Sequence, residues 1–315
     1  MISVDQVTKS FGRTRAVDNL SFEVPSGSVC GFLGPNGAGK TTTIRMLAGA
    51  IAPDAGSLRV GSADVRRDQM LARRSIGYLP ESNALPPDAR VDEYLKFRCG
   101  LWGVAPRVHK AAVARVVERC QLESVRRKLI GSLSRGFRQR VGLAASLVAS
   151  PAVVILDEPA TGLDPVTAQA FRGIVQSLRG EHTVLFSSHN LSEVEAVCDH
   201  LVLLGGGRLV AQGTATDLRR RGAVAARFDL ECTGGDVGAL GSVAGVIEVR
   251  SESLADGWTR IVVAADESHP DVGALPTRLA AVLQHVNASV RRFERVEPPL
   301  EEVFGRLISR AGGAR

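Results

Sequence analysis

Cysteine and lysine are scarce in this sequence, and no long apolar run occurs. The five cysteines lie far apart with no Cys-x-x-Cys pair, which argues against a disulfide framework and against a zinc site. This pattern is typical of a protein in the reducing cytosol. No uncharged apolar run reaches the roughly 20 residues of a membrane-spanning helix, so we expect that the chain does not cross a membrane by itself. The first residues, MISVDQVTKSF, have no basic region followed by an apolar one, and we expect no secretory signal there.

Length and charge predict two domains. The chain has 315 residues, more than one small domain needs, and 44% of them are hydrophobic, as in globular proteins. Residues 1–222 carry 29 basic and 20 acidic side chains, whereas residues 223–315 carry 10 and 13. This change of sign predicts domains at 1–222 and 223–315. The basic excess suits nucleic acid, phosphate ligands or an anionic membrane, and charge alone does not choose among them.

Apolar patterning predicts an α/β fold in the first domain. Strands are expected at 2–8, 20–24, 28–33, 75–79, 153–156, 184–187 and 201–204. Helices are expected at 40–50, 165–179 and 191–198, and two or three helical segments within 91–130. Strands that alternate with helices favour a mostly parallel sheet. Residues 223–315 read as a small α+β domain, with strands near 225–231, 245–250, 259–264 and 289–295, a helix near 275–286 and a last helix after Pro298 and Pro299.

A glycine-rich loop between an expected strand and an expected helix carries a phosphate-binding motif. Residues 34–41 read GPNGAGKT, which fits G-x-x-x-x-G-K-[ST]; with only five lysines in the chain, about 0.006 chance matches are expected. Glycines let backbone N–H groups curl around phosphate oxygens, Lys40 supplies a charge to the β- and γ-phosphates, and Thr41 offers a hydroxyl to Mg²⁺. The predicted nucleotide-binding residues are Gly34, Pro35, Asn36, Gly37, Ala38, Gly39, Lys40, Thr41 and Thr42.

Two acids end an apolar strand in the middle of the chain. Residues 153–156 read VVIL and are followed by Asp157 and Glu158. The carboxyl ends of such strands face the ligand crevice, so Asp157 is expected to hold Mg²⁺ and Glu158 to orient or deprotonate the attacking water. The alternative is a solvated helix start before Pro159.

A second anion site is predicted at residues 133–140, LSRGFRQR, where a serine and a glycine precede a helical apolar stretch. With these motifs in order, residues 1–220 resemble the nucleotide-binding subunit of ABC transporters. The likeness is greatest to ATP-binding subunits of bacterial drug, antibiotic and gliding-motility exporters. It implies a P-loop ABC nucleotide-binding domain with a mostly parallel sheet, an antiparallel β subdomain and a helical signature subdomain, followed by an accessory C-terminal domain.

The resemblance assigns roles to isolated positions. It implies that Phe11 stacks on adenine and that Ser134 and Gly136 grip the γ-phosphate of the nucleotide bound to a second copy. It also implies that Asp164 lies in a loop that crosses between copies and that His189 is the catalytic switch histidine. Without the resemblance, Phe11 would be interpreted as an aromatic residue of the core or of a turn, and His189 as a helix-capping or core histidine.

The sequence also departs from the family pattern. Glu81 stands where the family usually has a Gln that senses Mg²⁺, and it is expected to accept a metal contact. Arg135 and Phe137 replace the Gly and Gln of the commonest signature.

The implied function is an ATPase that energises a separate membrane permease. The resemblance implies ATP and Mg²⁺ as ligands, a head-to-tail homodimer, and a peripheral place on the cytoplasmic face of the membrane, with export as the direction and no nucleic acid as partner. Residues 83–130 are implied to dock on the permease. One alternative is a soluble ABC ATPase acting on nucleic acid or ribosomes. Another alternative is a small-molecule kinase or GTPase. It leaves residues 133–140 unexplained, and the guanine-reading NKxD motif of GTPases is absent from this sequence.

Overall fold

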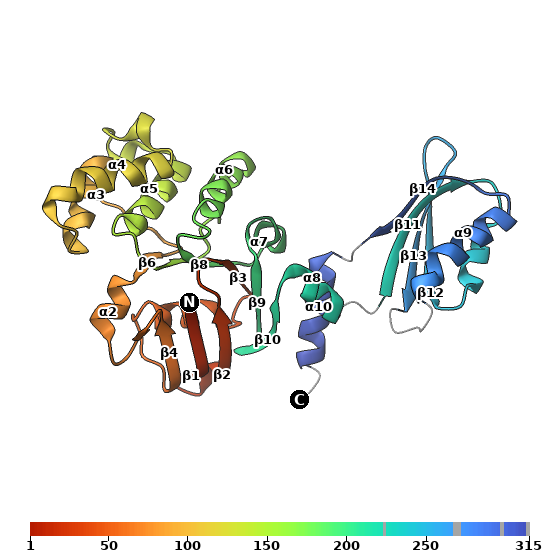
Figure 1. Ribbon diagram of the computed structural model, residues 1–315, viewed down its shortest axis with the longest axis horizontal. Coiled ribbons are helices and arrows are strands. Elements are labelled where there is room, and N and C mark those ends of the chain that lie inside the picture. Colours follow the sequence, from red (N-terminus) through yellow and green to blue (C-terminus); the bar gives the residue numbers. More distant parts are fainter. Residues whose placement is uncertain (223–224, 267–271, 297–298, 313–315) are drawn as a thin grey trace. The chain divides into compact units, whose positions relative to one another are not determined.

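The computed structural model describes residues 1–222, 225–266, 272–296 and 299–312 (Figure 1). The chain divides into two compact units, Met1–Ala215 together with the segment from Ile308 onward, and Thr216–Leu307. Residues 223–224, beside the expected domain boundary, and Pro298, before the expected last helix, lie outside the described residues.

A six-stranded sheet forms the centre of the first unit, in the order β10-β9-β3-β8-β7-β6. Its strands are β3 (Val29–Leu33), β6 (Ile76–Leu79), β7 (Val153–Leu156), β8 (Thr183–Ser188), β9 (His200–Gly205) and β10 (Arg208–Gly213). Neighbouring strands are parallel except β10, which is antiparallel to β9. The apolar runs of β3 and β7 are buried along their whole length, as expected for strands covered on both faces.

A second sheet in this unit has the order β2-β1-β4-β5 and is antiparallel. Its strands are β1 (Ile2–Phe11), β2 (Thr14–Val24), β4 (Ala55–Val60) and β5 (Ala63–Asp64). Its inner face and helix α1 (Lys40–Leu47) share one hydrophobic core with the main sheet. Phe22 of β2 and Phe32 of β3 meet in that core, with ring centroids 5.3 Å apart.

Helices complete the first unit: α2 (Gln69–Arg74), α3 (Val91–Leu101), α4 (His109–Arg119), α5 (Arg135–Leu147), α6 (Pro165–Gln176) and α7 (Leu191–Val197). Helix α4 buries Val113, Val116 and Val117 along one face, as the helical spacing predicts. Residues 91–130 are divided into the helices α3 and α4, as the expected two or three segments predict, with short 3-10 turns at Pro106–Val108, Glu123–Val125 and Ile130–Ser132. The described part of the chain contains no helix with the length and apolar character needed to cross a membrane.

The second unit is the small α+β structure predicted from the sequence. Strands β11 (Ala225–Thr233), β12 (Val246–Ser253), β13 (Thr259–Asp266) and β14 (Ser289–Val296) form an antiparallel sheet in the order β12-β13-β11-β14. Helix α9 (Leu275–His285) packs Leu279 and Leu283 against Phe228 and Ile261 of the sheet. Short 3-10 turns occur at Val237–Ser242 and Val272–Ala274. Both boundaries between the units fall within helices: the boundary after Ala215 in α8 (Ala215–Gly222) and the boundary after Leu307 in α10 (Leu300–Gly312).

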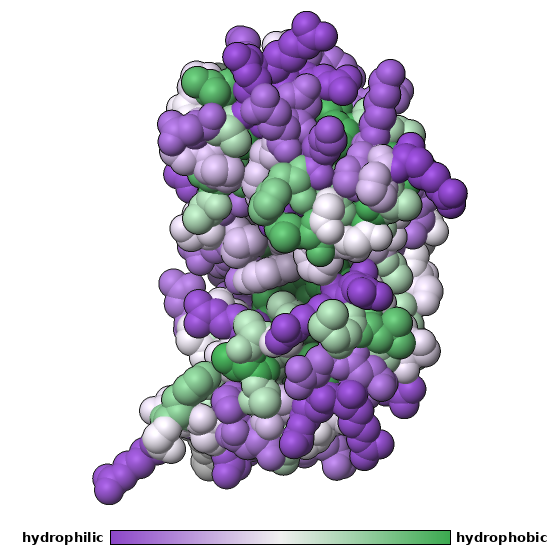
Figure 2. All heavy atoms as spheres, turned by 90° about the vertical axis from the view of Figure 1, so that its left-hand side faces the viewer, coloured by the Kyte–Doolittle hydropathy of each residue, from purple (hydrophilic) through white to green (hydrophobic). Residues whose placement is uncertain are grey.

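One face of the first unit exposes large apolar side chains. Met70 and Leu71 of α2 are 66% and 55% exposed, and Phe97 and Leu101 of α3 are 60% and 63% exposed. Figure 2 shows apolar side chains gathered across the middle of the molecule on the side that carries α2 and α3. We call these four residues the α2–α3 face. Nearby, Ala48, Arg73, Ile76, Tyr78, Pro80, Arg98 and Trp102 line a groove of about 360 Å³.

Candidate nucleotide-binding site

The glycine-rich loop joins β3 to α1, and two of its glycines have no room for a side chain. A Cβ on Gly34 would lie 2.7 Å from the carbonyl oxygen of Leu204. A Cβ on Gly39 would lie 2.6 Å from the carbonyl oxygen of Ala16, and Gly39 also has φ +95°. The loop therefore needs glycine at both positions to curl tightly before the start of α1, which is the geometry of a phosphate cradle.

Lys40 is held inside this loop. Its Nζ donates to the carbonyl oxygens of Gly34 at 2.5 Å and Pro35 at 3.4 Å, and it lies 3.9 Å from Oε1 of Glu158. Burial lowers the pKa of Lys40, and the carboxylates of Glu158 and Asp157 oppose that shift. The lysine is thus a partly desolvated positive charge with acids beside it, placed to donate hydrogen bonds to phosphate oxygens.

Asp157 lies at the carboxyl end of β7 and is 3% exposed. Burial raises the pKa of its carboxyl group, a hydrogen bond from Ser187 opposes the rise, and Glu81 and Glu158 add to it. A buried carboxylate with acids around it gains stability from a nearby cation, so the donor set suits a hard ion such as Mg²⁺. In the described ranges no group of three His, Cys, Asp or Glu side chains is arranged to hold a metal ion by itself. The hydroxyl of Thr41 and the nucleotide would supply further oxygen ligands.

Ser187, which the sequence analysis did not select, connects the two acids. Its Oγ donates to Oδ1 of Asp157 at 2.8 Å and accepts from the backbone N–H of Glu158 at 2.9 Å. Glu158 has φ +47°, a left-handed conformation that is unfavourable for a residue with a side chain, and the bond to its N–H helps to hold it. Two serines, Ser187 and Ser188, end β8, but the place of Ser187 beside Asp157 depends on the pairing of β8 with β7.

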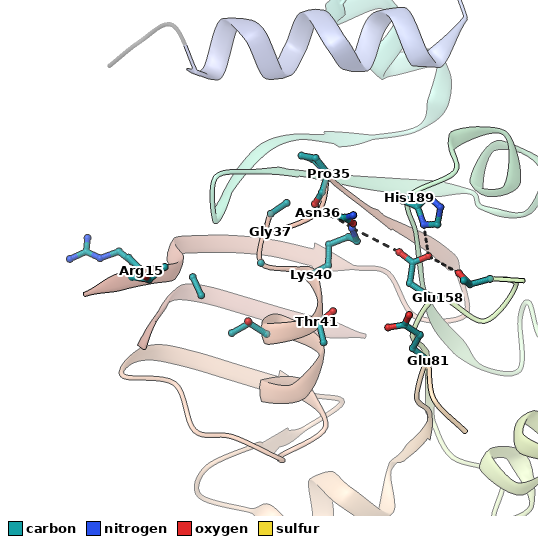
Figure 3. Close-up of a pocket in the computed structure, with 15 residues that line it drawn as sticks. Arg15, Pro35, Asn36, Gly37, Lys40, Thr41, Glu81, Glu158 and His189 are labelled. Carbon is teal, nitrogen blue, oxygen red and sulfur yellow. Dashed lines mark hydrogen bonds and ion pairs between the residues drawn. The ribbon is translucent and has the colours of Figure 1, made fainter. Parts of the chain in front are cut away.

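Glu158, His189 and Thr161 meet around one carboxylate oxygen (Figure 3). His189 Nδ1 lies 2.8 Å from Oε2 of Glu158, and the Oγ1 of Thr161 donates to the same oxygen at 3.2 Å. These three residues and Glu81 line a cavity of about 530 Å³. Thr161 was not among the predicted site residues, and the predicted Gly34 and Asp157 do not line the cavity. The predicted residues that also line it are Pro35, Asn36, Gly37, Ala38, Gly39, Lys40, Thr41 and Thr42. The arrangement can bind a polyphosphate on one side and orient a water on the other.

Phe11 does not line this cavity. It ends β1, is 53% exposed, and has the Lys9 Nζ 5.6 Å from its ring centroid. The cavity wall nearest to this hairpin consists of Thr14, Arg15 and Ala16, which the sequence analysis did not select. The three residues follow Phe11 by three to five positions, at the start of β2.

The signature residues also lie outside the cavity lining. Ser134 caps α5 by accepting from the backbone N–H of Phe137 at 3.4 Å. Asp164 caps α6 by accepting from the N–H and the Oγ1 of Thr167 at 3.0 and 2.6 Å, and these bonds lower the pKa of Asp164. A Cβ on Gly136 would lie 2.3 Å from Cγ2 of Thr167, so Gly136 allows α5 and α6 to approach. Within one chain, these residues are not brought to the phosphate loop.

Comparison with known proteins agrees with this geometry. A family model described as "ABC transporter" matches residues 17–161, and a Nod factor export ATP-binding protein I from Rhizobium etli is 35% identical over 98% of this chain and 93% of its own length. The chain belongs to the ABC transporter family. The linearmycin resistance ATP-binding protein LnrL of Bacillus subtilis is 30% identical over 98% of this chain and 99% of its own length.

The family assignment also agrees with solved structures. The solved structure titled "Structure of ATP binding subunit of ABC transporter" superposes with a TM-score of 0.64 at 26% identity, covering 70% of this chain and 92% of that chain. A second family model, described as "AAA domain, putative AbiEii toxin, Type IV TA system", matches residues 129–195, the region of α5, β7 and β8. The chain is thus an ATP-binding subunit of the ABC transporter family, as its motifs predict.

Proposed function

We propose that this chain hydrolyses ATP to energise a separate membrane permease that exports its cargo. The observation that carries the proposal is the single cavity in which Lys40, Glu158 and His189 converge beside the glycine cradle. A nucleotide-binding module without hydrolysis would need the cradle and the lysine, but not a carboxylate in hydrogen-bond contact with a histidine.

Each residue has a defined task in the proposed reaction. Lys40 binds the β- and γ-phosphates, Glu158 accepts a proton from the attacking water, and His189 orients the Glu158 carboxylate through Nδ1. Asp157 and Thr41 would hold Mg²⁺, with Glu81 at the edge of the cavity as a further oxygen ligand. When bound, Mg²⁺ neutralises charge between the phosphates.

Two copies of the chain complete each site in this proposal. Ser134 and Gly136 of one copy would meet the γ-phosphate held by the loop of the other, with Asp164 in the segment between them. A two-fold head-to-tail pair uses the same surfaces on both copies and closes on itself. We further propose that residues 1–222 form the nucleotide-binding domain and residues 223–315 an accessory domain.

The α2–α3 face is the proposed permease contact. The groove beside it is lined mainly by apolar groups, and the Nε of Arg98 and the Nε1 of Trp102 are buried without hydrogen-bond partners. Exposed apolar patches are typical of surfaces that pair with another protein. A short permease helix seated there would place the chain on the cytoplasmic face of the membrane.

The proposed direction, export, is supported by the names of the relatives, which include Nod factor export and linearmycin resistance proteins. The alternative is a soluble ABC ATPase acting on nucleic acid or ribosomes, favoured by the nine excess basic side chains of residues 1–222.

A co-purification experiment distinguishes the permease-coupled ATPase from the soluble ATPase. Tagged Glu158→Gln protein is expressed in its native cells, and membranes are solubilised gently with ATP present. We expect a multi-span permease in near-equal amount. Recovery with ribosomes or DNA and without a membrane protein would overturn the proposal.

A further inference from the structure

The first residue of the signature helix contacts the segment that leads from Glu158 to α6. Nη2 of Arg135 donates to the backbone carbonyl oxygen of Thr161 at 2.7 Å. The next residue, Gly162, has φ +70°, and a Cβ there would lie 2.3 Å from Nη1 of Arg135. The guanidinium group therefore lies against the backbone at Gly162, whose positive φ favours glycine.

The second residue of the helix contacts the other end of the same segment. Gly136 has no Cβ that would collide with Thr167, and Thr167 is fixed by both carboxylate oxygens of Asp164. Arg135 thus hydrogen-bonds to one end of residues 161–167, and Gly136 leaves room for Thr167 at the other end. A displacement of the α5 N-terminus would be transmitted to this segment through the bond of Arg135.

The segment in turn contacts the catalytic acid. Oγ1 of Thr161 donates to Oε2 of Glu158 at 3.2 Å, on the oxygen that His189 also contacts. Arg135, Thr161 and Glu158 also line one further cavity of about 560 Å³. A chain of contacts therefore runs from the Arg135 guanidinium through Thr161 to the Glu158 carboxylate, within a single copy of the protein.

We propose that Arg135 is a positioning residue for Glu158 and acts through Thr161. This inference rests on the proposed function, because it concerns the carboxylate that activates water. Arg135 stands where the commonest signature has glycine, which offers no such contact. In this chain the signature helix would both meet the second copy's nucleotide and hold its own Glu158 in place.

A double-mutant cycle tests the proposal on the full chain. Arg135→Met removes the bond to the carbonyl oxygen of Thr161, and Thr161→Val removes the hydroxyl that meets Glu158. One charge-assisted hydrogen bond at an exposed site corresponds to about a 5- to 10-fold loss of kcat, with the KM for ATP unchanged. The double variant should be no slower than the slower single variant, because both changes interrupt the same path. Arg135→Lys should recover part of the rate.

Arg179→Met is the matched control, because Arg179 also donates a guanidinium hydrogen bond to a backbone carbonyl oxygen, that of Val197 at 3.2 Å. Arg179 lines neither the cavity that contains Lys40 nor the cavity that contains Arg135. Its kcat should stay within twofold of wild type.

Two outcomes would overturn the inference alone, and a third would overturn the proposed function together with it. Multiplicative losses in the double variant would show that Arg135 acts independently of Thr161. A raised KM for ATP, with weaker ATP-dependent dimerisation of Arg135→Met in a Glu158→Gln background, would place Arg135 on the second copy's nucleotide instead. A wild-type chain that binds ATP and releases no phosphate would end the proposed function and the inference together, whereas the first two results leave ATP hydrolysis intact.

Discussion

Replacing Glu158 with glutamine should separate ATP hydrolysis from ATP binding. The amide has the shape of the carboxylate but cannot accept the proton from water, and loss of a general base lowers kcat by about 10²–10⁴-fold. At 1.36 kcal/mol per tenfold change, the barrier rises by about 2.7–5.4 kcal/mol. The affinity for ATP should stay the same or rise, because the variant removes the Glu158 charge that competes with the phosphates for Lys40. That charge lies 3.9 Å from Lys40 Nζ, and the attraction between the two is about 4 kcal/mol at an effective dielectric constant near 20.

The assay pairs steady-state phosphate release with equilibrium binding of a fluorescent ATP analogue. Glu181→Gln is the control, because Glu181 is an exposed acid that pairs with Arg119 away from the cavity. Phosphate release by Glu158→Gln within tenfold of wild type, at normal ATP affinity, would refute Glu158 as the base. Loss of ATP binding in this variant would instead mean that Glu158 supports the loop through Lys40.

Three further outcomes follow from the same geometry. Lys40→Met should weaken ATP binding by at least tenfold in the same binding assay, because it removes the positive charge buried in the loop. Ser187→Ala should lower kcat about tenfold and raise the Mg²⁺ concentration for half-maximal activity, since Asp157 and Glu158 each lose one hydrogen bond, whereas Ser187→Thr keeps the hydroxyl. Leu279→Ala should lower the free energy of unfolding by about 2–5 kcal/mol in urea denaturation, because the side chain is fully buried under the sheet of the second unit.

The phosphate loop and the acid pair were predictable because each is a contiguous motif after a buried strand. The apolar runs of β3 and β7 are long enough to identify without tertiary context, and the polar residues that follow them share one edge of a parallel sheet. The fold class follows from the same runs. A local signal was sufficient wherever one segment carries both the strand and the chemistry.

Features that depend on pairing between distant segments were missed. Strand β4 reads AGSLRV, starts with an alanine and a glycine, and becomes a strand because it pairs with β1, about 50 residues earlier. The role of Ser187 depends on the register between β7 and β8, which sequence spacing does not reveal. Thr14, Arg15 and Ala16 line the cavity because the β1–β2 hairpin approaches the loop, a tertiary contact that has no motif.

The charge at the start of α5 supports the proposal that this helix meets an anion from outside its own chain. Helix α3 has Asp92 and Glu93 in its first turn, which suits the positive end of a helix dipole. Helix α5 has no acid there, and Arg135 and Arg138 add positive charge to that end. Ser134 supplies the only cap among the described contacts, through a bond of 3.4 Å. Such a terminus is unfavourable for an isolated helix and favourable beside a phosphate. Because Ser134 does not line the cavity of its own chain, the proposed source of that phosphate is the nucleotide of a second copy.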